Sequence, residues 1–114
     1  MEPVDIAKKI VDVVSDKLAV DVLMLDISNV GSFADYFVIC SAKSQRQINA
    51  IVKEIDKVLG DAGVDVHHRE GKGESGWVLL DYSDVIVHVF DPDTRDYYGL
   101  EQLWSKAKPV IRIQ

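Results

Sequence analysis

The segment from Gly31 to Asp35 is the first part of the sequence whose residue types could do chemistry. A Gly31-Ser32 turn followed by Asp35 is the pattern of a nucleotidyl-transfer site, where the turn holds phosphate and paired carboxylates hold magnesium. Such a site needs a second carboxylate about two residues further along the strand, so that both side chains reach one face. Phe37 occupies that position. We therefore interpret Asp35 as structural, and the catalytic interpretation stays open as an alternative.

Three other features could carry chemistry, and each has a simpler interpretation. The glycine-rich segment 69–76 lacks the spacing of a phosphate-binding loop and precedes a predicted strand, so we expect a flexible hairpin loop. His67 and His68 are adjacent on a predicted strand, so their rings point to opposite faces and do not share a metal ion. Cys40 lies in an apolar run, where a thiol packs as a small hydrophobe. We predict no catalytic residue, no metal site and no cofactor.

Acidic and aromatic residues gather in the last third of the chain. The acidic ones are Asp81, Asp84, Asp91, Asp93 and Asp96. Turn and cap chemistry explains part of this group. The aromatic ones are Trp77, Tyr82, Tyr97, Tyr98 and Trp104. Tryptophan and tyrosine often anchor protein interfaces, but they also fill cores and cover core edges, so this pattern indicates a binding surface without separating the two roles.

The elements that must position these residues follow from hydrophobic periodicity. Residues 4–18 carry apolar side chains at helical spacing and predict an amphipathic first helix. Residues 22–27 and 36–41 are predicted strands, and the second is apolar on both faces, as a central strand is. A second helix begins at the N-cap residue Ser44, with a glutamine three residues later completing a capping box. It ends near Gly60 and Gly63, either of which can adopt a left-handed cap.

The second half of the chain continues with strands and a broken helix. Residues 64–68 predict a short strand, parallel to the strand before the helix through a right-handed crossover. Residues 77–80 and 85–90 predict an antiparallel hairpin. Asp91 is a predicted N-cap, and the short helical region that follows it is broken near Gly99 and continues toward Trp104. We expect an α/β (α+β) fold with a mixed sheet of about five strands and flanking helices. It forms a single domain over residues 1–105, and 106–114 is a short C-terminal tail, with an added edge strand as the alternative.

The composition is that of a folded globular chain and narrows the function classes. Thirteen basic and 19 acidic side chains among 114 residues give a net charge of −6. Free nucleic acid is disfavoured as the main partner, because its non-specific binding rests on many lysine and arginine contacts. No apolar run approaches the roughly 20 residues that span a bilayer, no secretory signal is evident, and a single cysteine forms no internal disulfide. We expect a cytoplasmic protein without a membrane partner.

Three long blocks carry a family resemblance: 34–41 (ADYFVICS), 76–90 (GWVLLDYSDVIVHVF) and 94–104 (TRDYYGLEQLW). They closely resemble the ribosomal silencing factor family, also called Iojap-like, in the same order and with matching helices between them. The departures are small. Ser83 replaces a common glycine in the turn, and Ala42-Lys43 replaces a Gly-Thr pair before the capping serine. Each is expected to alter only local turn geometry.

The resemblance implies a factor that binds the large ribosomal subunit through large-subunit ribosomal protein fourteen, blocks joining of the small subunit and so represses translation. It also implies a role in large-subunit maturation and a nucleotidyltransferase-like fold without a working active site. The implied docking surface is an exposed sheet face and edge with the partner-binding residues Trp77, Leu79, Asp81, Tyr82, Asp84, Tyr98 and Leu100. Trp77 would supply the apolar anchor, and the acids would meet basic side chains.

Two alternatives of other classes remain. One is a small magnesium-dependent nucleotidyltransferase-like enzyme that uses Asp35 with acids of the last hairpin. The other is a self-associating module, because a patch that docks on a partner can also pair with itself as a homodimer when the protein is free.

Overall fold

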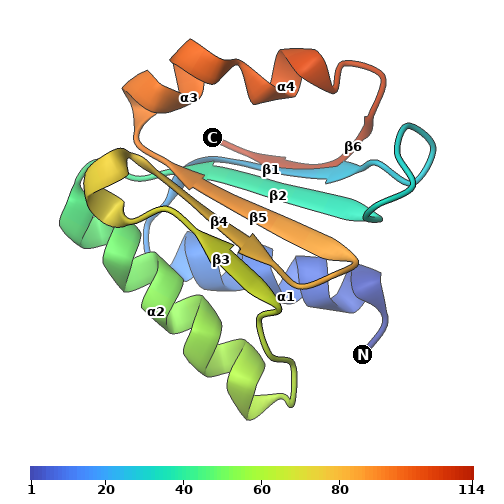
Figure 1. The fold of residues 1–114 in the computed structure, drawn as a ribbon, viewed down its shortest axis with the longest axis horizontal. Coiled ribbons are helices and arrows are strands. Elements are labelled where there is room, and N and C mark those ends of the chain that lie inside the picture. The colour runs from blue at the N-terminus through green and yellow to red at the C-terminus, as the bar shows by residue number, and fades with distance from the viewer.

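A computed structural model describes residues 1–114 and contains one six-stranded mixed sheet with helices on both faces (Figure 1). The strands follow one another in space in the order β3-β4-β5-β2-β1-β6. Their bounds are β1 Val20–Asp26, β2 Tyr36–Ser41, β3 His68–Glu70, β4 Trp77–Asp81, β5 Val85–Phe90 and β6 Lys108–Ile113. The expected sheet had about five strands, and the tail supplies the sixth, because 108–113 pairs antiparallel with β1.

The helices form two layers, one of long helices and one of short helices. The long helices α1 (Pro3–Asp16) and α2 (Gln45–Asp61) cover one face of the sheet, while α3 (Pro92–Tyr98) and α4 (Leu100–Leu103) lie over the other (Figure 1). A short 3₁₀ turn, η1 (Gly73–Ser75), precedes β4. None of the helices has the length and apolar character needed to cross a membrane.

The pairing of the strands corrects one expectation about the middle of the chain. The ladder of the third strand begins at His68, whereas the expected strand was 64–68. Val64 and Val66 have strand-like spacing, but they are half-buried and pack against the core from an irregular segment. β2 pairs in parallel with β5, not with β3, because the β4–β5 hairpin lies between them. β3 still runs in the same direction as β2, since two antiparallel steps separate β3 from β5.

The face under α1 and α2 holds the larger core, built almost entirely from aliphatic side chains. Its most deeply buried members from the helices are Ala7, Ile10, Val14, Ile48, Ile51, Ile55 and Leu59. The predicted capping box at the start of α2 is present in a modified form. The Ser44 hydroxyl accepts from the Gln47 backbone N–H at 3.1 Å, and the Gln47 amide accepts from the Lys43 N–H and donates to the Lys17 and Leu18 carbonyls. The Gln47 side chain therefore links the C-terminal end of α1 to the N-terminal end of α2.

The opposite face holds a smaller core with more aromatic character. Its buried members are Leu23, Leu25, Ile27, Ala34, Phe37, Ile39, Phe90 and Ala107. The half-buried Trp77, Leu100 and Trp104 pack against them. Because α3 and α4 are short, they leave part of this face uncovered near β4. The candidate functional site lies there.

Candidate functional site

A groove of about 650 Å³ lies between β4, the loop before it and α3. Its lining combines aromatic, aliphatic and acidic side chains from three separate parts of the chain: Glu70, Gly71, Ser75, Trp77, Leu79, Asp93, Thr94, Tyr97 and Tyr98. We call this the aromatic groove. Alternation along β4 directs Trp77 and Leu79 to this face while Val78 and Leu80 enter the aliphatic core.

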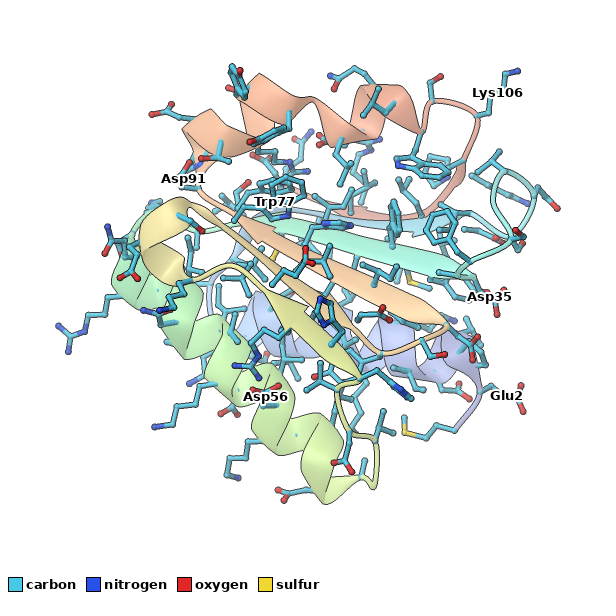
Figure 2. The ribbon with its side chains drawn as sticks, in the orientation of Figure 1. Glu2, Asp35, Asp56, Trp77, Asp91 and Lys106 are labelled. Atoms are coloured by element: carbon cyan, nitrogen blue, oxygen red, sulfur yellow. The ribbon has the colours of Figure 1, made fainter.

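Trp77 forms the wall of the aromatic groove. Its ring stacks on Phe90 with centroids 4.9 Å apart and an interplanar angle of 28°, and it meets Tyr98 at 4.8 Å. Figure 2 shows the side chain between the sheet and the α3 layer, near Asp91 and at the opposite end of the sheet from Asp35. The Trp77 indole N–H donates inward to the Nδ1 atom of His88 at 3.2 Å.

His88 lies directly behind Trp77 on β5 and was not among the expected site residues. It is 4% exposed, and Phe37 meets it edge to face at a centroid distance of 4.9 Å. Burial lowers the pKa of His88 from 6.5 to about 4, so the ring is neutral near pH 7. Since Nδ1 accepts from the indole, the neutral ring carries its proton on Nε2, and that buried nitrogen has no hydrogen-bond partner.

The loop before β4 is folded against the body, although a flexible loop was expected. Gly73 lies so close to α2 that a Cβ atom would come within 2.6 Å of the Asn49 amide oxygen. Gly76 has a φ of +79°, and a Cβ there would meet the Asp91 carboxylate. The Asp91 N–H donates to the Gly76 carbonyl at 2.8 Å. These close contacts explain why a glycine-rich segment forms a defined wall of the groove.

The α3–α4 segment is held over the sheet by one buried cation. Arg95 is 8% exposed, and its Nη1 donates to the Ser41 hydroxyl at 2.9 Å and to the Asp21 carbonyl at 2.7 Å. Its Nε faces Glu101 at 3.3 Å. The predicted cap at Asp91 is confirmed, since its carboxylate accepts from the Thr94 N–H at 2.8 Å. The segment turns at Gly99, whose φ is +54°, which is the predicted break in this helix.

The structure brings together three of the expected partner-binding residues and separates the others. Trp77, Leu79 and Tyr98 line the aromatic groove. Asp81 follows on the same face of β4, and its carboxylate accepts from the Ser83 N–H at 2.7 Å, which is turn chemistry. Leu100 packs half-buried against the smaller core.

Asp84 and Tyr82 lie at the turn of the hairpin, away from the groove. Asp84 is exposed, and its carbonyl accepts from the Asp35 N–H at 2.8 Å. Tyr82 is 4% exposed and belongs to the aliphatic core, with its hydroxyl donating to Asp56 at 3.3 Å. Burial also raises its pKa well above the usual value. Tyr82 therefore does not share a surface with Trp77, because it is an odd number of residues away along an extended strand.

The site residues expected from the sequence did not include six members of the groove lining, which are Glu70, Gly71, Ser75, Asp93, Thr94 and Tyr97. Glu70 and Asp93 place carboxylates in the groove lining, and Tyr97 is 82% exposed. Tyr97 and Asp93 had been noted only within larger aromatic and acidic groups. The sequence does contain a signal for His88, because it lies two residues before Phe90 and so points to the same face of the strand. Phe90 pairs with Trp77 across the hairpin. The contact between His88 and Trp77 follows only once this pairing register is known.

The enzyme alternative gains no support from the arrangement of side chains. No group of three or more His, Cys, Asp or Glu side chains is placed to hold a metal ion. Asp35 is half-exposed and lies at the end of β2 where the chain enters the sheet. Cys40 is fully buried, and desolvation raises the pKa of its thiol to about 12, so it is a poor nucleophile and packs as expected.

Comparisons with known proteins agree with the fold and the sequence blocks. The family described as "Ribosomal silencing factor during starvation" matches residues 1–114. The ribosomal silencing factor of Bacillus subtilis is 47% identical over 92 residues, which cover 81% of this chain and 78% of that protein. A crystal structure from Chromobacterium violaceum aligns with a TM-score of 0.88 at 36% identity, covering 92% of this chain and 88% of that one.

A more distant relative extends the comparison to organelles. The mouse protein named "Mitochondrial assembly of ribosomal large subunit protein 1" is 29% identical over 102 residues, which cover 84% of this chain and 43% of that protein.

Proposed function

The chain belongs to the family of ribosomal silencing factors, and from this premise we propose that it docks on the large ribosomal subunit through the aromatic groove and blocks joining of the small subunit. We assign the contact on the subunit to large-subunit ribosomal protein fourteen. The same docking would take part in large-subunit maturation. The protein would act in the cytoplasm as a repressor of translation.

The observation that carries the proposal is the open aromatic groove. Trp77, Tyr97 and Tyr98 offer large apolar surfaces with few rotatable bonds, which is what interface anchors require. Glu70 and Asp93 supply negative charge, and the lining contains no lysine or arginine. A basic protein surface with apolar side chains therefore complements the charge and the aromatic character of the groove.

The mechanism requires occupancy and no catalysis. A body bound to the joining face of the large subunit excludes the small subunit by occupying its space. If the factor binds only the free large subunit, a concentration of about 100 times its Kd opposes joining by about 2.7 kcal/mol. Excess small subunits would then relieve the block, and preformed ribosomes would resist splitting.

Gradient sedimentation tests this proposal. Purified large subunits are incubated with wild type, Trp77→Ala or Tyr97→Ala before small subunits are added. We expect wild type to travel with large subunits and to block joining. Losing a central aromatic anchor costs about 2 kcal/mol, so Trp77→Ala should bind about 30-fold more weakly. Tyr97→Ala is the safer variant for folding, because this side chain is 82% exposed.

Leu18→Asn is the matched control. Leu18 is a 76% exposed apolar residue after α1, with a φ of +64° that asparagine tolerates. It should bind and block like wild type. Binding by Tyr97→Ala and Trp77→Ala equal to wild type would refute the groove as the docking surface. If wild type itself neither binds nor blocks, the proposed function is wrong. Sedimentation of the free protein at several concentrations tests the homodimer.

A further inference from the structure

The orientation of the Trp77 ring is set by a polar contact as well as by packing. Apolar contact with Phe90 and Tyr98 confines the ring but does not distinguish its flipped orientations, because such contact is not directional. The hydrogen bond from the indole N–H to His88 Nδ1, at 3.2 Å, does distinguish them. His88 itself is confined between Phe37 and Phe90, so it presents a stationary acceptor.

The polar atoms of His88 make no stabilising contact other than the one with Trp77. Its Nε2–H is buried without a partner, which destabilises the folded state. Its ring sits among aromatic neighbours, where an aliphatic side chain of similar volume would pack without that penalty. The single hydrogen bond that the imidazole makes is the one to Trp77. The contact therefore serves the orientation of Trp77 more than the stability of the core.

We propose that His88 is a positioning residue, whose Nδ1 atom holds the Trp77 indole in its docking orientation and removes the indole N–H from the surface. This inference rests on the proposed function of the aromatic groove. It specifies the partner chemistry at the anchor, because Trp77 then offers only its ring faces and edges. The group that packs on it is an aliphatic chain or a planar cation such as a guanidinium, and not a carbonyl that needs a donor.

Two substitutions separate positioning from stability. His88→Leu removes the acceptor and retains apolar volume, so this variant should melt at or above the wild-type temperature. His88→Asn retains an acceptor oxygen near the Nδ1 position but leaves a smaller side chain with a buried amide, so it should melt lower. The indole N–H resonance of Trp77 is followed by NMR, with that of Trp104 as the internal reference. Affinity for purified large subunits is measured in parallel.

We expect the variant with the higher melting temperature to bind large subunits more weakly. In His88→Leu the Trp77 indole resonance should lose its hydrogen-bonded shift, and binding should weaken about tenfold. In His88→Asn the resonance should stay near its wild-type position and binding should stay within about threefold of wild type, despite the lower melting temperature.

The opposite pattern overturns the inference. If affinity follows melting temperature, or if His88→Leu leaves the indole resonance and the affinity unchanged, His88 is only a core residue. These outcomes leave the proposed function intact. Absence of large-subunit binding by wild type is a separate failure and refutes the proposed function; the inference about docking orientation is then refuted with it, even if the indole resonance responds to His88.

Discussion

The two faces of the sheet carry different types of side chain and are covered by helices to different degrees. Under α1 and α2, aliphatic side chains such as Ile51 and Ile55 are fully buried and leave little polar chemistry inside. Under α3 and α4, aromatic rings pack with a neutral histidine, an arginine is buried, and Trp77 stays half-exposed. The aliphatic face derives its stability from non-directional burial, whereas the aromatic face also depends on oriented hydrogen bonds.

This difference separates stability from docking. In the aliphatic layer any gap costs packing energy. A face covered by two short helices can leave a groove because Arg95 and the 69–76 loop hold its walls in place. Substitutions on the first face should therefore change stability alone, and those on the second should change docking as well.

The largest expected effect is in the aliphatic core. Ile55 on α2 is 0% exposed, so Ile55→Ala should lower the free energy of unfolding by about 3 to 4 kcal/mol through lost burial and a cavity. Urea unfolding measures this change. At temperatures where the variant remains folded, it should bind large subunits like wild type. Weakened binding by the folded variant would contradict the division between the two faces.

The next effect is a pH dependence on the aromatic face. The pKa of His88 is about 4 in the folded state against 6.5 when exposed, so only the unfolded state takes up the proton between these values. The titration of His88 therefore leaves stability unchanged above pH 6.5 and lowers the free energy of unfolding as pH falls toward 4, by about 3 kcal/mol in total. Urea unfolding at pH 7 and 4.5 should show wild type losing more stability than His88→Leu. Equal losses of stability in the two proteins would contradict the lowered pKa of His88.

A smaller loss is expected at the anchor of the α3–α4 segment. Arg95→Met keeps much of the buried volume but removes the hydrogen bonds to Ser41 and Asp21, at a cost of about 2 kcal/mol. Because the groove wall moves with α3, large-subunit binding should weaken too. Calorimetry and sedimentation measure the two effects. Unchanged binding would mean that the groove does not depend on this anchor. Glu101→Gln, at the partly exposed end of the contact, should have the milder effect.

The smallest expected effect is a gain in stability at the β4–β5 turn. Ser83 has a φ of +77°, a conformation that costs a residue with a side chain but not glycine. Ser83→Gly should raise the free energy of unfolding by about 0.5 to 1 kcal/mol, with docking unchanged. Thermal unfolding checks the sign. A destabilised variant would mean that the Ser83 hydroxyl stabilises the turn by more than the positive φ destabilises it.

Local physics let the sequence by itself determine most of the elements. The bounds of β5 agree with the apolar run 85–90, and the caps at Ser44 and Asp91 form as their residue types predict. Such features depend on neighbours within about four residues, so a linear pattern contains them. The family blocks likewise indicated Trp77, Leu79 and Tyr98 as parts of one surface, and these three residues do line one groove.

Only the tertiary structure decided which distant residues meet. The register of the hairpin places Tyr82 in the aliphatic core and His88 behind Trp77. The packing of the 69–76 loop against the rest of the fold makes this glycine-rich segment one wall of the groove. The sixth strand depends on β1 having a free edge for residues 108–113. Each of these outcomes is set by contacts between segments far apart in the chain, whose register and burial no local pattern specifies.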